Sequence, residues 1–162
     1  MNAKKVSLIA MLTALCFVFA WMEAQIPALV AVPGVKLGLT NLVVLVALYQ
    51  LGTKEAIIIN FVRIVLVGFT FGNLYSMWYA LAGGLLATAG MIIFKNVIKA
   101  RIVTVSIIGG LLHNLGQIFV AMIVLQTDAL LYYLVVLCIT GSVAGCLIGL
   151  IGAGVVSRLR RS

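Results

Sequence analysis

Residues 102–125 read IVTVSIIGGLLHNLGQIFVAMIVL, an apolar stretch of 24 residues that contains no Asp, Glu, Lys or Arg. A helix needs about 20 mainly apolar residues to cross the roughly 30 Å hydrocarbon core of a membrane. Similar stretches occupy about 6–26, 37–53, 55–71, 74–94 and 129–156. A backbone in lipid must satisfy its own hydrogen bonds, and the alternating pattern of a β-barrel is absent. The sequence therefore predicts an all-α polytopic membrane protein, a six-helix bundle that forms one integral membrane domain over residues 1–162.

Positive charge is concentrated in alternate gaps between these stretches. The chain is 65% hydrophobic and 9% charged, with a formal net charge of +8. Nine of its eleven basic residues lie in the four segments that must share one side of the bundle: Lys4, Lys5, Lys54, Lys95, Lys99, Arg101, Arg158, Arg160 and Arg161. The positive-inside rule then places both termini in the cytoplasm, in a multi-pass protein surrounded by the lipid of a bacterial cytoplasmic membrane. Because the charges form no continuous patch, nucleic acid is a poor candidate partner.

Polar side chains inside the apolar stretches form the candidate site. His113, Asn114 and Gln117 share a helix face near mid-membrane, and Asn60 and Arg63 share another. Such groups cost a few kcal/mol each to bury in lipid unless they are paired or hydrated. They indicate either a ligand cavity open to the outside or an interhelical network, with Arg63 paired to a carboxylate or to backbone carbonyls. The candidate ligand-binding residues are Lys36, Asn41, Asn60, Arg63, Trp78, His113, Asn114 and Gln117.

Two of these candidates, Lys36 and Arg63, are cations placed away from the cytoplasmic side. This position favours a ligand with an anionic or strongly hydrogen-bonding end and an apolar remainder. Glu23 and Asp128 are alternative partners that would neutralise both cations within the protein. Residues 27–36 hold both prolines of the chain and leave the helical pattern on the outer side, as a lid or as a rigid turn.

Small residues spaced by four mark close helix contacts. Gly141, Gly145 and Gly149 lie on one face of the last stretch, where we expect packing within the chain. Ala10 and Ala14 form an Ala-x-x-x-Ala pair on the first stretch, which could dock a partner.

Residue sets for catalysis are missing from the sequence. There are only three acidic residues, no paired carboxylates at short spacing, no metal-ligand spacing among the three cysteines, and no Walker A motif. The sequence predicts a protein that is not an enzyme, holds no metal, and gives no indication of a cofactor. If the protein transports a molecule, the energy would come from a partner or from an ion gradient, because the sequence has no Walker A motif.

Residues 33–41 (PGVKLGLTN) and 113–117 (HNLGQ), together with the helix of Arg63 and the Gly83-Gly84 pair, carry a family resemblance. Over essentially the whole chain, they resemble the Gx transporter family, also known as heptaprenyl diphosphate synthase component I. That family is similar in turn to the S-components of energy-coupling factor (ECF) transporters. The resemblance implies a six-helix subunit that binds a small molecule from outside and docks on a T-component with two ATPases. It also implies that Ala10 and Ala14 form the docking motif and that the 27–36 loop caps the ligand.

Three functional hypotheses follow. The first is a substrate-binding membrane subunit for uptake of a small molecule, like an ECF S-component. The second is a non-catalytic membrane partner in isoprenoid or quinone metabolism, and the third is a membrane subunit of a flavin- or quinone-linked electron-transfer system. Neighbouring genes for a T-component with ATPases, for a polyprenyl synthase, or for flavinylated proteins would separate them.

Overall fold

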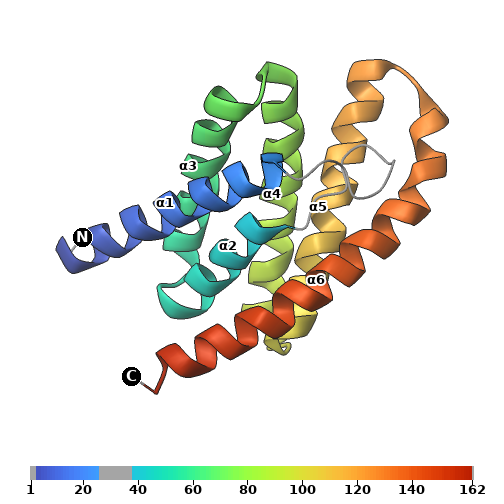
Figure 1. Cartoon of the computed structure of the whole chain (residues 1–162). Helices are drawn as coiled ribbons and strands as arrows, with labels where there is room; N and C mark the ends of the chain where they lie inside the picture. Colours follow the sequence, from blue (N-terminus) through green and yellow to red (C-terminus); the bar gives the residue numbers. More distant parts are fainter. Residues whose placement is uncertain (1–2, 26–37, 162) are drawn as a thin grey trace.

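The computed structural model describes residues 3–25 and 38–161, and every regular element in those ranges is helical (Figure 1). The elements are α1 (Ala3–Gln25), α2 (Leu39–Gln50), α3 (Thr53–Phe71), α4 (Leu74–Asn96), α5 (Ile102–Leu125), the short 3-10 helix η1 (Asp128–Leu130) and α6 (Leu131–Leu159). The all-α prediction is confirmed. The predicted 102–125 helix matches α5 at both ends, and the other long stretches match α1, α3, α4 and α6 within three residues at their described ends.

Four segments are long and apolar enough to cross a membrane: α1, α4, α5 and the continuous stretch Asp128–Leu159. They support a multi-pass membrane protein. α3 has 19 residues but carries three charges, on Lys54, Glu55 and Arg63. α2 has only 12 residues, about 18 Å of helix at 1.5 Å per residue. The predicted 37–53 span extends past the C-terminal end of α2, which lies at Gln50. The helix stops there, and Gly52, with a φ of 119°, forms the turn that leads into α3. The number of spans remains a prediction.

α2 is the interior helix of the bundle. Its middle, from Val43 to Leu48, is buried on every side, and it packs against α1, α3 and α6. A helix that is apolar all round can be buried among other helices or can face lipid, and the packing of α2 shows that it is buried. At its C-terminal end, the Leu48 carbonyl accepts a hydrogen bond from Lys95 Nζ, which also lies 5.0 Å from the ring centre of Tyr49. The N-terminal end of α2 lies inside the bundle, where Thr40 is buried and Thr40 and Asn41 face the other helices.

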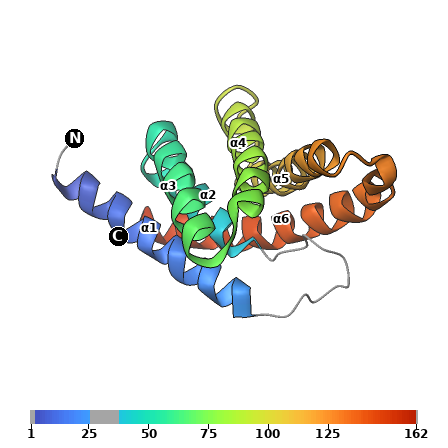
Figure 2. The same cartoon turned by 90° about the horizontal axis from the view of Figure 1, so that it is seen from above.

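Glycines set the spacing of the long helices. A Cβ at Gly83 of α4 would lie 2.6 Å from the His113 carbonyl oxygen of α5. A Cβ at Gly141 of α6 would lie 2.9 Å from the Gly110 carbonyl oxygen, also of α5. Only glycine permits backbones this close. The small-residue face of α6 therefore packs within the chain, as expected, and Figure 2 shows α6 running past α5 along one side of the bundle.

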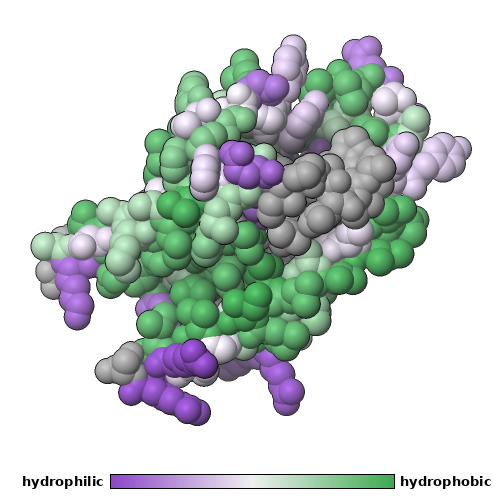
Figure 3. All heavy atoms as spheres, in the orientation of Figure 1, coloured by the Kyte–Doolittle hydropathy of each residue, from purple (hydrophilic) through white to green (hydrophobic). Residues whose placement is uncertain are grey.

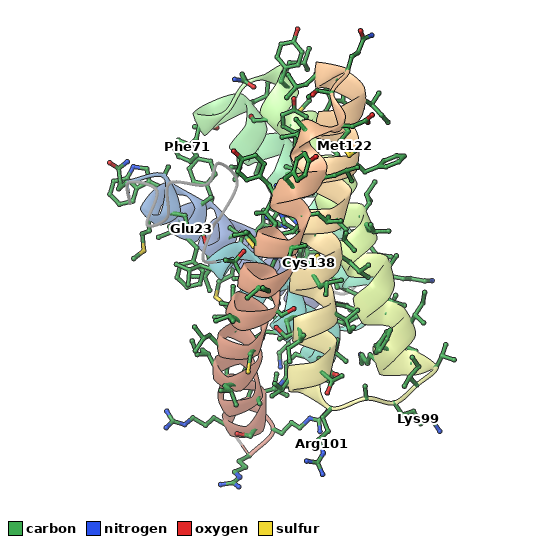
Figure 4. The ribbon with its side chains drawn as sticks, turned by 90° about the vertical axis from the view of Figure 1, so that its right-hand side faces the viewer. Glu23, Phe71, Lys99, Arg101, Met122 and Cys138 are labelled. Carbon is green, nitrogen blue, oxygen red and sulfur yellow. The ribbon has the colours of Figure 1, made fainter. Side chains whose placement is uncertain are left out.

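The two ends of the bundle differ in charge. Figure 4 shows Lys99 and Arg101 at one end, far from Glu23 and Phe71. The link between α4 and α5 and the C-terminal end of α6 both lie at this end, which we call the basic end. Figure 3 shows apolar side chains over most of the lower half of the visible face, with hydrophilic ones at its left and lower edges and in its upper part. This arrangement fits a bundle whose middle lies in lipid.

Candidate functional site

A cavity of about 400 Å³ lies within the bundle and is lined by residues from all six α-helices. This volume is in the range of small-molecule sites, which are usually about 300–1,000 Å³. Gly72 and Asn73, at the turn between α3 and α4, line it, so the cavity reaches the end opposite the basic end. Its polar lining residues are Glu23, Thr40, Asn41, Arg63, Asn73, Ser76, Ser106, His113, Asn114, Gln117 and Thr140.

Arg63 is the buried cation of this cavity, with only 7% of its surface exposed. Its Nη1 donates to Thr40 Oγ1 at 2.8 Å and its Nη2 donates to Asn41 Oδ1 at 3.0 Å. Both acceptors lie in the first turn of α2, whose burial brings them to mid-bundle. Arg63 Nε donates to Asn60 Oδ1 at 2.9 Å, one turn earlier in α3.

Asn60 supports Arg63 from behind and does not line the cavity. It is 2% exposed, and its Nδ2 donates to the Gly84 carbonyl oxygen at 3.0 Å and to Thr88 Oγ1 at 2.9 Å. The Asn60 side chain thus accepts a hydrogen bond from Arg63 within α3 through its Oδ1 and donates hydrogen bonds to α4 through its Nδ2. An interhelical network around Arg63 exists, and its acceptors are a hydroxyl and two amide oxygens; the network considered from the sequence, as one of two alternatives, had a carboxylate or backbone carbonyls as acceptors.

Glu23 has a different partner from the one considered for it. Its Oε1 accepts a hydrogen bond from the backbone N–H of Leu39 at 2.9 Å, in the first turn of α2. A carboxylate is favourable there because the N-terminus of a helix carries partial positive charge. Asp128 starts η1 and is exposed. Within the described ranges, the ion pair found joins Lys5 Nζ to Glu55 Oε1 at 2.6 Å.

The polar face of α5 forms a wall of the cavity, as its spacing predicts. His113, Asn114 and Gln117 all line it. Asn114 also ties α5 to α6, because its Nδ2 donates to the Leu137 carbonyl oxygen at 2.6 Å. Thr140, one turn before Ala144 on α6, faces the same space. The structure therefore brings Asn41 and Arg63 together with these three residues around one cavity.

Two candidates are placed elsewhere. Trp78 is 55% exposed and is not part of the cavity lining, since this face of α4 turns outward. Lys36 and the 27–36 loop lie outside the described residues. Sequence reasoning left out Thr88, Ser106 and Thr140, because a threonine or serine in an apolar helix usually bonds its own backbone and gives no directional signal.

A second hollow lies on the outside of the bundle, between α1 and α3. Ala10 and Ala14 are exposed and lie in it. Its other lining residues are Val6, Ile9, Thr13, Phe17, Val18, Val62 and Leu66. We call this surface the α1–α3 groove. It is apolar apart from Thr13, whose hydroxyl donates to the Ile9 carbonyl oxygen of its own helix.

Comparison with known proteins gives one positive result. No curated protein and no solved structure matches the chain. The family model described as heptaprenyl diphosphate synthase component I matches residues 12–155, nearly the whole chain. The match includes the cavity helices and both glycine-mediated contacts. The chain therefore belongs to the heptaprenyl diphosphate synthase component I family.

Proposed function

We propose that this protein is the substrate-binding membrane subunit of a small-molecule uptake system, similar to an ECF S-component. The observation that carries the proposal is the 400 Å³ cavity, which all six α-helices line and which contains side chains able to hydrogen-bond a ligand. A bundle that only needed to pack would fill this space with apolar side chains. Polar groups at membrane depth are instead typical of a substrate pathway.

The position of the cavity supports binding from one side. The cavity reaches the turn between α3 and α4, whereas the basic residues gather at the other end of the bundle. In the orientation that the positive-inside rule favours, the basic end faces the cytoplasm and the cavity takes its ligand from outside.

The α1–α3 groove supplies a surface for the partner. Its exposed Ala10 and Ala14 allow another helix to approach the α1 backbone closely, which is how helices associate in lipid. We propose that a T-component, carrying two ATPases, docks here. The groove is separate from the cavity, so that docking leaves the ligand site unobstructed.

The family description favours a second function. A protein described as component I of a heptaprenyl diphosphate synthase would be a non-catalytic membrane partner of a polyprenyl synthase. The two proposals differ in what binds the protein. Affinity purification from native membranes should recover a T-component and ATPases in the first case, and a soluble polyprenyl synthase in the second.

Native mass spectrometry of the detergent-purified protein tests the uptake proposal. We expect a small molecule to co-purify with the wild type, and Gln117→Ala to weaken its retention by about 1–3 kcal/mol through loss of a cavity hydrogen bond. Asn96→Ala is the matched control, because Asn96 is exposed at the basic end of α4 and lies outside the cavity. A wild-type protein that never carries a small molecule, and gains none on incubation with cell extract, would contradict a substrate-binding role.

A further inference from the structure

The charge of Arg63 is not balanced by the groups that hold it. A guanidinium has five N–H donors, and the three hydrogen bonds of Arg63 go to the side-chain oxygens of Thr40, Asn41 and Asn60. All three acceptors are uncharged. No carboxylate oxygen lies within 4.0 Å of its nitrogens in the part of the chain that the structure describes. Arg63 is nevertheless buried, with only 7% of its surface exposed.

The carboxylates of the described residues are engaged or distant. Glu23 lines the same cavity and attracts Arg63 electrostatically, but its oxygens lie more than 4.0 Å from the guanidinium, and one of them accepts the Leu39 N–H at the start of α2. Glu55 pairs with Lys5 and does not line the cavity. Asp128 is exposed at the start of η1 and does not line the cavity. A buried charge is costly unless it is paired, so a ligand with an anionic group would complete the arrangement around Arg63.

Apolar side chains also line the cavity, beside its polar groups. Ile64, Val67 and Phe71 line it from the Arg63 side, and Met77 and Ile148 line it from α4 and α6. A ligand that fits these surroundings has a charged end near Arg63 and an apolar or aromatic body.

We propose that the ligand is a small amphipathic anion whose carboxylate or phosphate group binds Arg63, with its apolar part against Phe71 and Met77. This inference rests on the proposed function, since it names the chemical class of the molecule that the cavity takes. Asn60, which holds Arg63 from behind, acts as a positioning residue. Thr40 and Asn41 aim the guanidinium from α2.

Two probes of nearly equal shape, benzoate and benzamide, test the charge requirement. Binding of each to the detergent-purified protein is measured by isothermal titration calorimetry. We expect benzoate to bind about tenfold or more tightly than benzamide, because both probes accept a hydrogen bond from Arg63 but only benzoate adds a negative charge opposite the guanidinium. The comparison uses the wild-type protein, so it needs no variant to fold.

Asn41→Asp then tests whether Arg63 is the residue responsible. Aspartate keeps an acceptor oxygen for Arg63 Nη2, which now lies 3.0 Å from Asn41 Oδ1, and it adds the counter-charge inside the protein. We expect the preference for benzoate to disappear while the thermal midpoint of the ligand-free protein is retained. Asn96→Asp adds the same charge at an exposed position outside the cavity and should keep the preference.

Several outcomes overturn the inference. They are equal binding of the two probes, binding of neither, or an unchanged preference in a folded Asn41→Asp protein. A neutral molecule that co-purifies with the protein also overturns it, yet leaves the proposed substrate-binding role intact. Native mass spectrometry in phosphatidylcholine nanodiscs, with and without phosphatidylglycerol, identifies the source of the anion. Retention of phosphatidylglycerol that Asn41→Asp abolishes assigns a lipid headgroup, and benzoate selectivity without lipid retention assigns a free anion.

Discussion

Asn60→Ala removes the side chain that joins α3 to α4 and holds Arg63. The substitution deletes three hydrogen bonds, of 2.9 Å from Arg63 Nε, 3.0 Å to the Gly84 carbonyl oxygen and 2.9 Å to Thr88 Oγ1. Because Asn60 is only 2% exposed, water from outside the bundle cannot readily replace it. The Arg63 guanidinium loses one acceptor and keeps its charge.

The expected loss of stability follows from these three bonds. Interhelical hydrogen bonds in membrane proteins average about 0.6 kcal/mol and reach about 1.7 kcal/mol. Two of the three bonds cross from α3 to α4 and one lies within α3; taking a similar value for each predicts a decrease of about 2–5 kcal/mol in the free energy of unfolding. The upper part of this range applies, because one bond involves a charged donor and the groups left behind are buried.

Equilibrium unfolding in mixed micelles, titrated with a denaturing detergent and followed by circular dichroism, measures this decrease. Asn96→Ala is the matched control, since Asn96 is exposed and makes one side-chain hydrogen bond of 3.3 Å, to Thr53 Oγ1. We expect that control to change stability by no more than about 0.5 kcal/mol. If Asn60→Ala costs as little as Asn96→Ala, the network does not stabilise the fold and the reasoning about Arg63 is refuted.

Three further predictions concern packing, docking and topology. Gly110→Val should destabilise the bundle by about 1–3 kcal/mol or more in the same assay, because a Cβ at Gly110 meets the α6 backbone. Gly154→Val is the control and should be nearly neutral, because a Cβ at Gly154 has no neighbouring atom within 4 Å. Ala14→Leu should leave the protein folded but abolish co-purification with a T-component, by filling the α1–α3 groove; unchanged co-purification would reject docking there. Cysteines introduced at Val97 and Thr127 should react with impermeant reagents from opposite sides of the membrane, and same-side labelling would refute the proposed topology.

The sequence alone determined the class of the protein and much of its helix pattern. Long apolar stretches are local features, so α5 could be placed at both ends and α1, α3, α4 and α6 to within three residues at their described ends. Helical spacing also placed His113, Asn114 and Gln117 on one face, because a turn of 3.6 residues depends on no distant neighbour. Their common location in the cavity agrees with that spacing.

Only the tertiary structure decided which polar groups meet. The middle of α2, from Val43 to Leu48, is apolar on every side and carries no sequence signal for its rotation, and lipid provides no hydrophobic force to choose its neighbours. The choice depends on backbone approach at glycines and on hydrogen bonds between residues distant in sequence. Arg63 therefore meets Thr40 and Asn41 where a carboxylate had been considered, while Trp78 points away from the cavity. Sequence spacing predicts which residues share a helix face, and the packing of the helices determines what that face contacts.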